Sequence, residues 1–203
     1  MQNKLYKMES KNKQIFLKKV TRKDLKKIKN WRNSKGVWEF NTQYTLLNQF
    51  NQKQWYDELL INSSQKMFII YNSQKKAIGI CGFRDINSEN KNADVSIILG
   101  DSKDRGKKLG TETLNLLVDY GFNKLNLHHI SASIFSYNFK SIKVFEKMNF
   151  KLDAIMRDCI WRNGKWWDIY KYSVLSEEYK NKQNFEVIAV GNLILKAKLM
   201  NQN

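Results

Sequence analysis

The sequence contains no proline, only two cysteines and no long apolar run. Cys81 and Cys159 are too few for a disulfide framework, and no CxxC pair or Cys/His cluster predicts a metal site. Residues 1–14 lack the apolar core of a signal peptide, and no stretch approaches the roughly 18 apolar residues of a membrane span. We therefore expect a cytoplasmic protein with reduced thiols, no bound metal and no membrane association.

Acidic residues are scarce as well. Asp and Glu number 19 against 36 Lys and Arg, which gives a formal net charge of +17. Such a field attracts nucleotides, nucleic acids and anionic cofactors, and it repels polycations. A genome biased toward A and T would also enrich Lys, Asn and Ile and deplete proline, so both explanations of the charge stay open. The charge does not exclude nucleic acid, but we do not expect it as a partner, because no RNP, helix-turn-helix or zinc signature is present.

The composition is that of a globular protein, with 203 residues, 42% hydrophobic and 13% aromatic. We expect a single domain over residues 1–180 and a C-terminal extension over residues 181–203. An apolar run after Phe185 in that extension predicts either an added strand or the contact of a homodimer.

Hydrophobic periodicity predicts an α+β (mixed α/β) chain. Residues 1–13 are expected to be a loose lead-in, and residues 37–50 are a polar and aromatic stretch between the first two helices. The predicted strands are 15–20, 67–72, 76–86, 93–100 and 128–135. One predicted helix begins at Thr21, and three others cover 51–64, 108–123 and 138–148. The chain ends in a predicted hairpin of strands 150–161 and 166–175, joined by an Asn163-Gly164 turn. Three antiparallel strands that lead into a β–α–β unit predict a central mixed, mostly antiparallel sheet flanked by helices.

The stretch KDRGKKLGTE, residues 103–112, leads into the helix predicted at 108–123. The first-turn amides of a helix lack internal partners, and the helix dipole makes that end positive. A basic, glycine-containing loop at this position therefore predicts a phosphate site. Dinucleotide and Walker loops are excluded, because no GxGxxG follows a strand and the spacing from Gly106 to Gly110 is too short for a Walker loop.

Residues 93–150 resemble the acetyl-CoA-binding core of the GNAT superfamily of N-acetyltransferases. The loop Arg105-Gly106-Lys107-Lys108-Leu109-Gly110 matches the superfamily pattern, except that Lys108 stands where the first glycine is usual. Asn138 opens the next helix as that pattern requires, and Phe145 stands where a Tyr is usual. The segments WRNSKGVW, ADVSIILG, YGFNKLNLHHI and WRNGKWWDIYKYSVLSEEY extend the resemblance over residues 15–180, to the branch of ribosomal-protein, spermidine and amino-sugar acetyltransferases. The resemblance implies the GNAT acyltransferase fold.

The resemblance also implies acetyl-CoA as the cosubstrate. The loop amides would hold the pyrophosphate, the end of the strand at 93–100 would pair with the pantetheine arm, and Asn138 would contact that arm from the far side. The cofactor-binding residues implied in this way are Ile97, Ile98, Leu99, Arg105, Gly106, Lys107, Lys108, Leu109, Gly110, Thr111 and Asn138. At a negative φ, Lys108 would be tolerated and would add a phosphate contact, whereas a positive φ would strain it and weaken binding.

Acetyl transfer requires that the amine lose a proton, that the oxyanion be stabilised and that the leaving thiolate be protonated. In the family that the chain resembles, the acid is a Tyr at the position that Phe145 holds here. Tyr137 is the candidate replacement for this acid. The alternative roles for Tyr137 are a contact with the cofactor and simple packing. Asp94 and Glu39 are the candidate bases; for Asp94, the structural alternative is a strand-end residue that bonds a loop. A thiol pKa of about 8.5 makes the thiolate a tolerable leaving group. We therefore expect slow transfer by direct attack in a ternary complex.

Trp31, Arg32 and Asn33 form a motif similar to one in relatives that act on nucleotide-linked amino sugars. Arg32 would bind an anion or cap the end of its own helix, and Asp168 would close over the substrate. Polyamine sites need carboxylates, so the acceptor that we predict is a small primary amine, such as an amino sugar on an anionic carrier. Two alternatives stay open: a CoA-binding module with little or no activity, and a protein N-terminal acetyltransferase of the ribosomal-protein type.

Overall fold

The computed structural model describes residues 7–10, 14–42 and 44–179. One sheet has the strand order β1-β2-β3-β4-β5-β6-β8-β7, and every neighbouring pair is antiparallel except β5 and β6. The strands are β1 (Lys7–Glu9), β2 (Ile15–Lys19), β3 (Lys66–Asn72), β4 (Ala77–Asn87), β5 (Asn92–Leu99), β6 (His129–Phe135), β7 (Lys151–Arg162) and β8 (Lys165–Leu175). The predicted mixed, mostly antiparallel sheet is confirmed.

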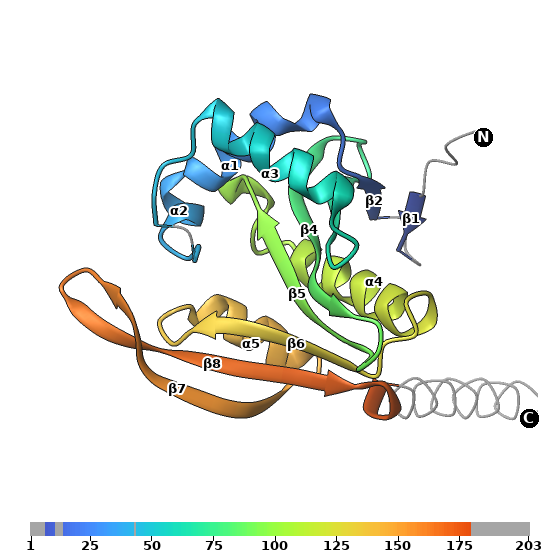
Figure 1. The fold of residues 1–203 in the computed structure, drawn as a ribbon, viewed down its shortest axis with the longest axis vertical. Coiled ribbons are helices and arrows are strands. Elements are labelled where there is room, and N and C mark those ends of the chain that lie inside the picture. Colours follow the sequence, from blue (N-terminus) through green and yellow to red (C-terminus); the bar gives the residue numbers. More distant parts are fainter. Residues whose placement is uncertain (1–6, 11–13, 43, 180–203) are drawn as a thin grey trace, which may run out of the picture.

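Helices cover both faces of this sheet, as predicted (Figure 1). They are α1 (Leu25–Asn33), α2 (Lys35–Trp38), α3 (Gln49–Ile61), α4 (Leu109–Asn123) and α5 (Phe139–Lys147), with short 3-10 turns at Arg22–Asp24 and Ser102–Asp104. Within the part of the chain that the structure describes, no helix is both long enough and apolar enough to cross a membrane.

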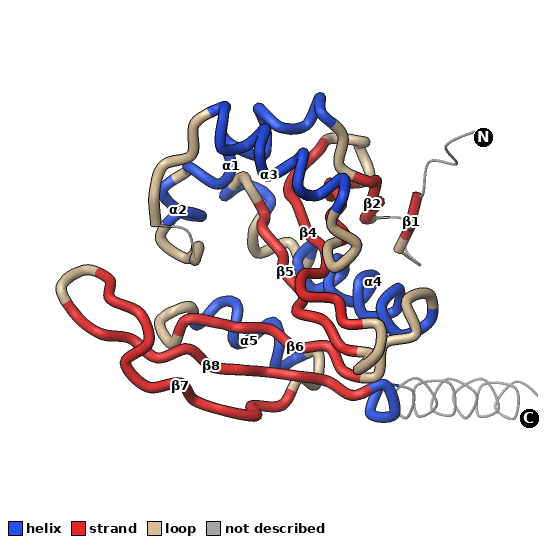
Figure 2. The backbone as a smooth tube through the Cα atoms, viewed as in Figure 1, coloured by secondary structure: helices blue, strands red, loops and turns tan. Residues whose placement is uncertain are grey.

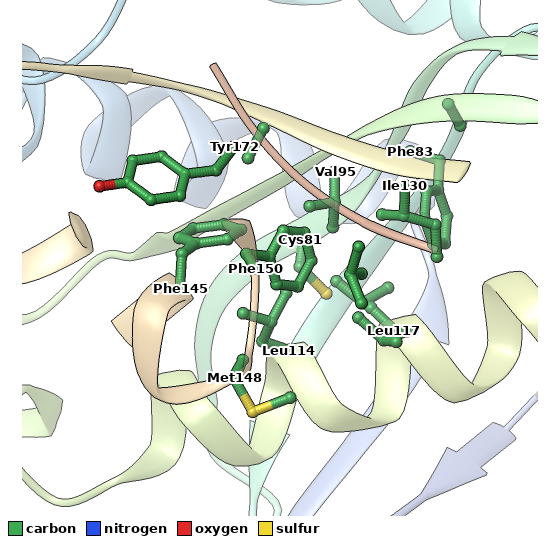
Figure 3. Close-up of a cluster of buried hydrophobic side chains, with 14 of the residues drawn as sticks. Cys81, Phe83, Val95, Leu114, Leu117, Ile130, Phe145, Met148, Phe150 and Tyr172 are labelled. Carbon is green, nitrogen blue, oxygen red and sulfur yellow. The ribbon is translucent and has the colours of Figure 1, made fainter. Parts of the chain in front are cut away.

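The two faces of the sheet have separate hydrophobic cores. Successive side chains of a strand point to opposite faces, and in β3 Met67 and Ile69 pack toward α1 while Phe68 and Ile70 join the larger cluster under α4 and α5. Figure 3 shows part of this larger cluster, where side chains from β4, β5, β6, α4 and α5 meet. Residues of both cores are almost fully inaccessible to solvent. The cores fix the sheet between two layers of helices.

The Asn163-Gly164 turn forms as predicted. Asn163 has φ 51° and Gly164 has φ 78°, the left-handed pair that a two-residue hairpin of right-handed twist requires. Two short elements were not predicted: β1, within the lead-in, and α2, within the polar and aromatic stretch. Both are too short to show a hydrophobic period, and β1 exists because it pairs with β2, opposite Leu17. The predicted strand or dimer contact after Phe185 lies outside the described residues, and the division at residue 180 stays a prediction.

Strands β5 and β6 separate soon after they meet. They pair only over Asn92–Asp94 and His129–Ser131, although β5 continues to Leu99 and β6 to Phe135. Along those remaining residues β5 is held by β4 and β6 by β8. Figure 2 shows the two strands diverging. We call this divergence, between Val95–Leu99 and Ala132–Phe135, the splay; it leaves one edge of β5 without a strand partner.

Candidate functional site

The loop at residues 106–111 presents a run of unused amides at the start of α4. Gly106 has φ 79°, Lys108 has φ 62°, and the first helical hydrogen bond runs from the Glu112 amide to the Lys108 carbonyl. Among the described residues, no acceptor bonds to the amide of any residue from 106 to 111. Left-handed residues that alternate with right-handed ones turn such amides toward one concave side, which suits an anion. The residues present therefore fit a pyrophosphate.

The backbone of Lys108 has the positive φ that would strain it, and not the negative φ that would be tolerated. Its φ is 62° and its ψ is 2°, in the left-handed region, and it precedes the first residue of α4. A side chain with a Cβ costs about 1 kcal/mol or more in that region. Lys108 is thus strained at the position where the superfamily loop pattern has a glycine.

The guanidinium of Arg105 is engaged with the protein. Its Nη2 donates a hydrogen bond to the Leu99 carbonyl at 3.3 Å, and a Cβ added at Gly36 would lie 2.9 Å from its Nη1. Arg105 thus joins the loop to the end of β5 and to α2. Its predicted contact with the cofactor stays a prediction.

The other predicted cofactor residues lie on the two sides of the splay. The unpaired edge of β5 includes Ile97, Ile98 and Leu99. Asn138 follows β6 and begins α5, where its Oδ1 accepts from the Ser141 amide at 3.3 Å. Its Nδ2 has no acceptor among the described residues, so this amide group is available to a ligand. The arrangement is the one that a pantetheine arm between the two strands would need.

Asp94 lies at the last paired position before the splay. Its strand neighbours are Arg84 on β4 and Ser131 on β6. The Ser131 hydroxyl donates to Asp94 Oδ1, and Lys171 Nζ lies 3.9 Å from Oδ2. The carboxylate therefore bonds a residue of the neighbouring strand β6. The alternative to a catalytic role had been that Asp94 bonds a loop. No donor among the residues that the structure describes bonds to Oδ2, which can therefore accept a proton directly or through water.

Glu39 and Tyr137, two of the other catalytic candidates, are in contact. The Tyr137 hydroxyl donates to the backbone carbonyl of Glu39 at 2.7 Å, and its ring packs on Trp167 with centroids 4.8 Å apart. Burial raises the pKa of Tyr137, while the charge of Arg162 acts in the opposite direction. A phenol that already donates to a carbonyl is poorly placed to protonate a thiolate. The contact supports the packing role, because it ties the end of α2 to the turn before α5.

Phe145 belongs to the core. It is 6% exposed and meets Phe150 edge-on, with centroids 4.9 Å apart (Figure 3). The tyrosine that reaches its helix is Tyr172 of β8, whose hydroxyl donates to Glu146 at 3.0 Å. Burial, and then this bond, raise the pKa of Tyr172 to about 12. Such a group is a weak acid, so neither tyrosine is an evident replacement for the missing one.

Two residues of the predicted substrate motif have structural contacts. The ring of Trp31 lies so close to Gly100 that a Cβ there would be 2.0 Å from its Cδ1, and this contact seats α1 on the end of β5. The side chain of Asn33 bonds both backbone groups of Leu47, at 2.8 and 2.9 Å. The structure thus gives both residues a positioning role, and their predicted substrate contacts stay predictions.

Arg32 and Asp168, the remaining predicted substrate residues, lie apart in the fold. Asp168 is in β8, and its Oδ1 accepts from the Asp158 amide at 3.1 Å, which braces the β7–β8 hairpin. Arg32 is near the end of α1, where burial, and then the charge of Arg84, lower its pKa. Its predicted substrate contact stays a prediction.

Three residues near Asp94 were not predicted from the sequence: Arg84, Ser131 and Lys171. The alternation of β4 would have placed Arg84 on one sheet face, but only the strand register shows that this is the face of Asp94. Ser131 and Lys171 come from strands distant in sequence, so no local pattern indicates them. Among the described residues, no three His, Cys, Asp or Glu side chains are grouped so that they could hold a metal ion.

The strain at Lys108 can be measured with two substitutions. Lys108→Gly and Lys108→Ala remove the same ammonium, but only glycine removes the Cβ that is unfavourable at φ 62°. We expect the glycine variant to have the higher free energy of unfolding, by about 1 kcal/mol, in urea denaturation. Equal stability of the two variants would show that the loop is not strained at this position.

Comparison with known proteins agrees with this geometry. A family model described as an acetyltransferase (GNAT) domain matches residues 14–151. An uncharacterised N-acetyltransferase of Bacillus licheniformis is 34% identical over 123 residues, which cover 61% of this chain and 68% of that protein. A spermidine N(1)-acetyltransferase of Vibrio cholerae is 25% identical over 173 residues, 84% of this chain and 98% of that one.

A solved structure supports the fold. The crystal structure of spermidine N-acetyltransferase from Vibrio cholerae in complex with CoA and spermine aligns with a TM-score of 0.78, at 23% identity, over 82% of this chain and 98% of that one. The resemblance seen in the sequence is thus confirmed by the family match and by the fold. The chain belongs to the GNAT family of acetyltransferases and is an N-acetyltransferase that depends on acetyl-CoA.

Proposed function

We propose that the protein transfers an acetyl group directly to a small primary amine that also carries an anionic group, such as an amino sugar on a nucleotide. The observation that carries this proposal is the position of Asp94. It is the last paired residue of β5 before the splay, so a carboxylate stands where the unpaired edge of β5 begins. When bound, acetyl-CoA supplies the acetyl thioester, and its thiolate leaves.

Asp94 acts as the base in this proposal. The amine must lose a proton before it can attack. Because Ser131 holds Oδ1, the carboxylate has a fixed orientation, and Oδ2 accepts the proton directly or through one water. Lys171 Nζ lies 3.9 Å from Oδ2 and forms an ion pair with it. No covalent intermediate with the protein is needed, so the transfer is direct.

The backbone and the loop complete the site. An amide of the unpaired β5 edge near Leu99 stabilises the oxyanion, as the fold leaves this edge without a strand partner. The free amides of residues 106–111 hold the pyrophosphate. Neither Phe145 nor the two tyrosines discussed above provides an obvious acid, so we expect the thiolate to leave unassisted and the transfer to be slow.

The anionic carrier follows from the charge of the chain and of the sheet face around Asp94. The net charge is +17, and the Asp94 carboxylate at the root of the splay already lies beside Lys171. A polycation would meet repulsion there. Polyamines are nevertheless the second candidate, because a relative that aligns over 84% of this chain is a spermidine acetyltransferase. The third candidate is a CoA-binding protein with little or no activity, because Phe145 stands where the family pattern has a Tyr acid.

A panel of acceptors separates these candidates. The purified protein is incubated with acetyl-CoA and nucleotide-linked amino sugars, phosphorylated amino sugars, polyamines or N-terminal peptides, and thiol release is measured. We expect release that depends on the anionic amines. Release with polyamines alone would replace the proposed acceptor, and release with none of them, while acetyl-CoA still binds, would establish the inactive module.

The role of Asp94 has its own test. Asp94→Asn removes the proton acceptor and keeps the shape, so kcat should fall by about 10²-fold or more, while the affinity for acetyl-CoA should stay unchanged. Asp153→Asn, an exposed position on β7, is the matched control. An Asp94→Asn variant with the original kcat and an unchanged Tm would mean that the carboxylate only bonds Ser131.

A further inference from the structure

The positive charge of the chain is concentrated in one short stretch. Residues 18–29 contain seven Lys or Arg residues in 12, whereas the whole sequence contains 36 in 203. The stretch has a single acidic residue, Asp24, whose carboxylate accepts hydrogen bonds from the amide and the hydroxyl of Thr21. The helix α1 has four basic residues and no acidic one. A genome-wide bias toward Lys would not gather the cations in this way.

The fold turns these cations outward on one side of a helix. Leu25 and Ile28 are buried in the core under α1, so the opposite side of this segment faces solvent. Lys23, Lys26 and Lys27 are exposed on that side, which we call the basic face. None of the three forms an ion pair with any residue that the structure describes. Like charges at helical spacing repel each other, and an anion laid along the basic face would relieve this repulsion.

The basic face borders a hollow with an exposed aromatic ring. The helix α3 packs beside α1 (Figure 1), and between them lies a hollow of about 250 Å³. The hollow is lined by Arg22, Leu25, Gln49, Phe50 and Lys53. Phe50 is 72% exposed. Arg22 has an ion pair with Asp57 at 3.3 Å, but both side chains are largely exposed, so the pair is weak and a phosphate can compete for the guanidinium.

Cations beside an exposed aromatic ring suit one class of polyanion. A single-stranded nucleic acid offers phosphates to the cations and unstacked bases to the ring, and a base stacks on an aromatic side chain whatever its identity. A duplex keeps its bases stacked inside. An anionic membrane binds helices that expose an apolar side, whereas α1 buries Leu25 and Ile28 in the core.

We propose that the basic face and the hollow at Phe50 bind a single-stranded nucleic acid, with the lysines on its phosphates and Phe50 stacked on a base. The inference goes beyond the proposed function and does not depend on which amine is acetylated. No sequence motif indicates this surface, because only the packing of α3 beside α1 brings Phe50 to the basic stretch. The helix α4, which follows the coenzyme loop, covers the opposite face of the sheet, so we expect coenzyme A and a strand to bind together.

Fluorescence anisotropy with a labelled oligonucleotide tests the surface. Oligouridine and oligothymidine of about 12 nucleotides are titrated at several salt concentrations, with coenzyme A saturating so that the loop is filled. A triple variant, Lys23→Gln, Lys26→Gln and Lys27→Gln, should bind both at least about 10-fold more weakly. Its plot of log K against log salt should be shallower by about 2, since each phosphate contact on a single strand contributes about 0.7. Phe50→Ala should weaken binding by about 5-fold or more.

A matched control separates the basic face from the net charge. The helix α5 exposes Lys140, Lys143 and Lys147 on the other side of the sheet. Replacing these three with Gln removes the same charge and should change the affinity by less than about 2-fold. Equal losses in the two triple variants would overturn the site, because only the net charge would then act. The Tm of both variants and thiol release by the basic-face variant, which we expect to be unchanged, verify that the fold is intact.

Vesicles of phosphatidylserine and phosphatidylcholine provide the alternative polyanion. We expect the protein to bind the oligonucleotides and the basic-face variant to lose that binding. Vesicle binding that depends on the basic face, in a protein that binds neither oligonucleotide, would overturn the proposal in favour of a membrane surface. Oligonucleotide affinity that Phe50→Ala leaves unchanged would overturn the stacking, and with it the preference for a single strand.

Discussion

The loss of pairing between β5 and β6 after Asp94 and Ser131 is the constraint on which the rest of the site depends. Each strand remains in the sheet because its other neighbour holds it, β4 in one case and β8 in the other. The backbone groups on the unpaired edge still require partners. A ligand that extends along β5 can provide them.

The contacts around the splay fix its two ends. At the root, the Ser131 hydroxyl bonds Asp94 across the last pair of residues. At the far end, Arg105 bonds the Leu99 carbonyl and Trp31 lies on Gly100, so α1, α2 and the loop meet the end of β5 together. The free amides at the start of α4 therefore have a defined position relative to β5, which a coenzyme that spans both requires.

Much of this fold could be predicted from the sequence, because its elements carry local signals. The spacing of α4 and α5 and the Asn163-Gly164 turn specify those elements directly. The free edge at the end of β5, which the resemblance assigned to the pantetheine arm, has no local signal, since pairing between strands distant in sequence leaves no local pattern. The positive φ of Lys108 was one of two alternatives, because a basic side chain does not determine its own backbone conformation.

The side chains at the site were harder to predict than the elements. Trp31 and Asn33 have a motif that indicates substrate contact, yet their partners, Gly100 and Leu47, come from other segments. Arg84 gave no signal, because only the register of β4 with β5 places it opposite Asp94. Tertiary contacts decide such roles, and local spacing does not encode them.

Amide hydrogen exchange, measured with and without CoA, tests the central claim most directly. The account predicts that CoA slows exchange at residues 106–111, whose amides have no acceptor among the described residues, and at Ile97–Leu99 on the unpaired edge of β5. Slowing confined to other elements, with residues 106–111 unchanged at saturating CoA, would contradict the assignment of the loop and the splay to the coenzyme.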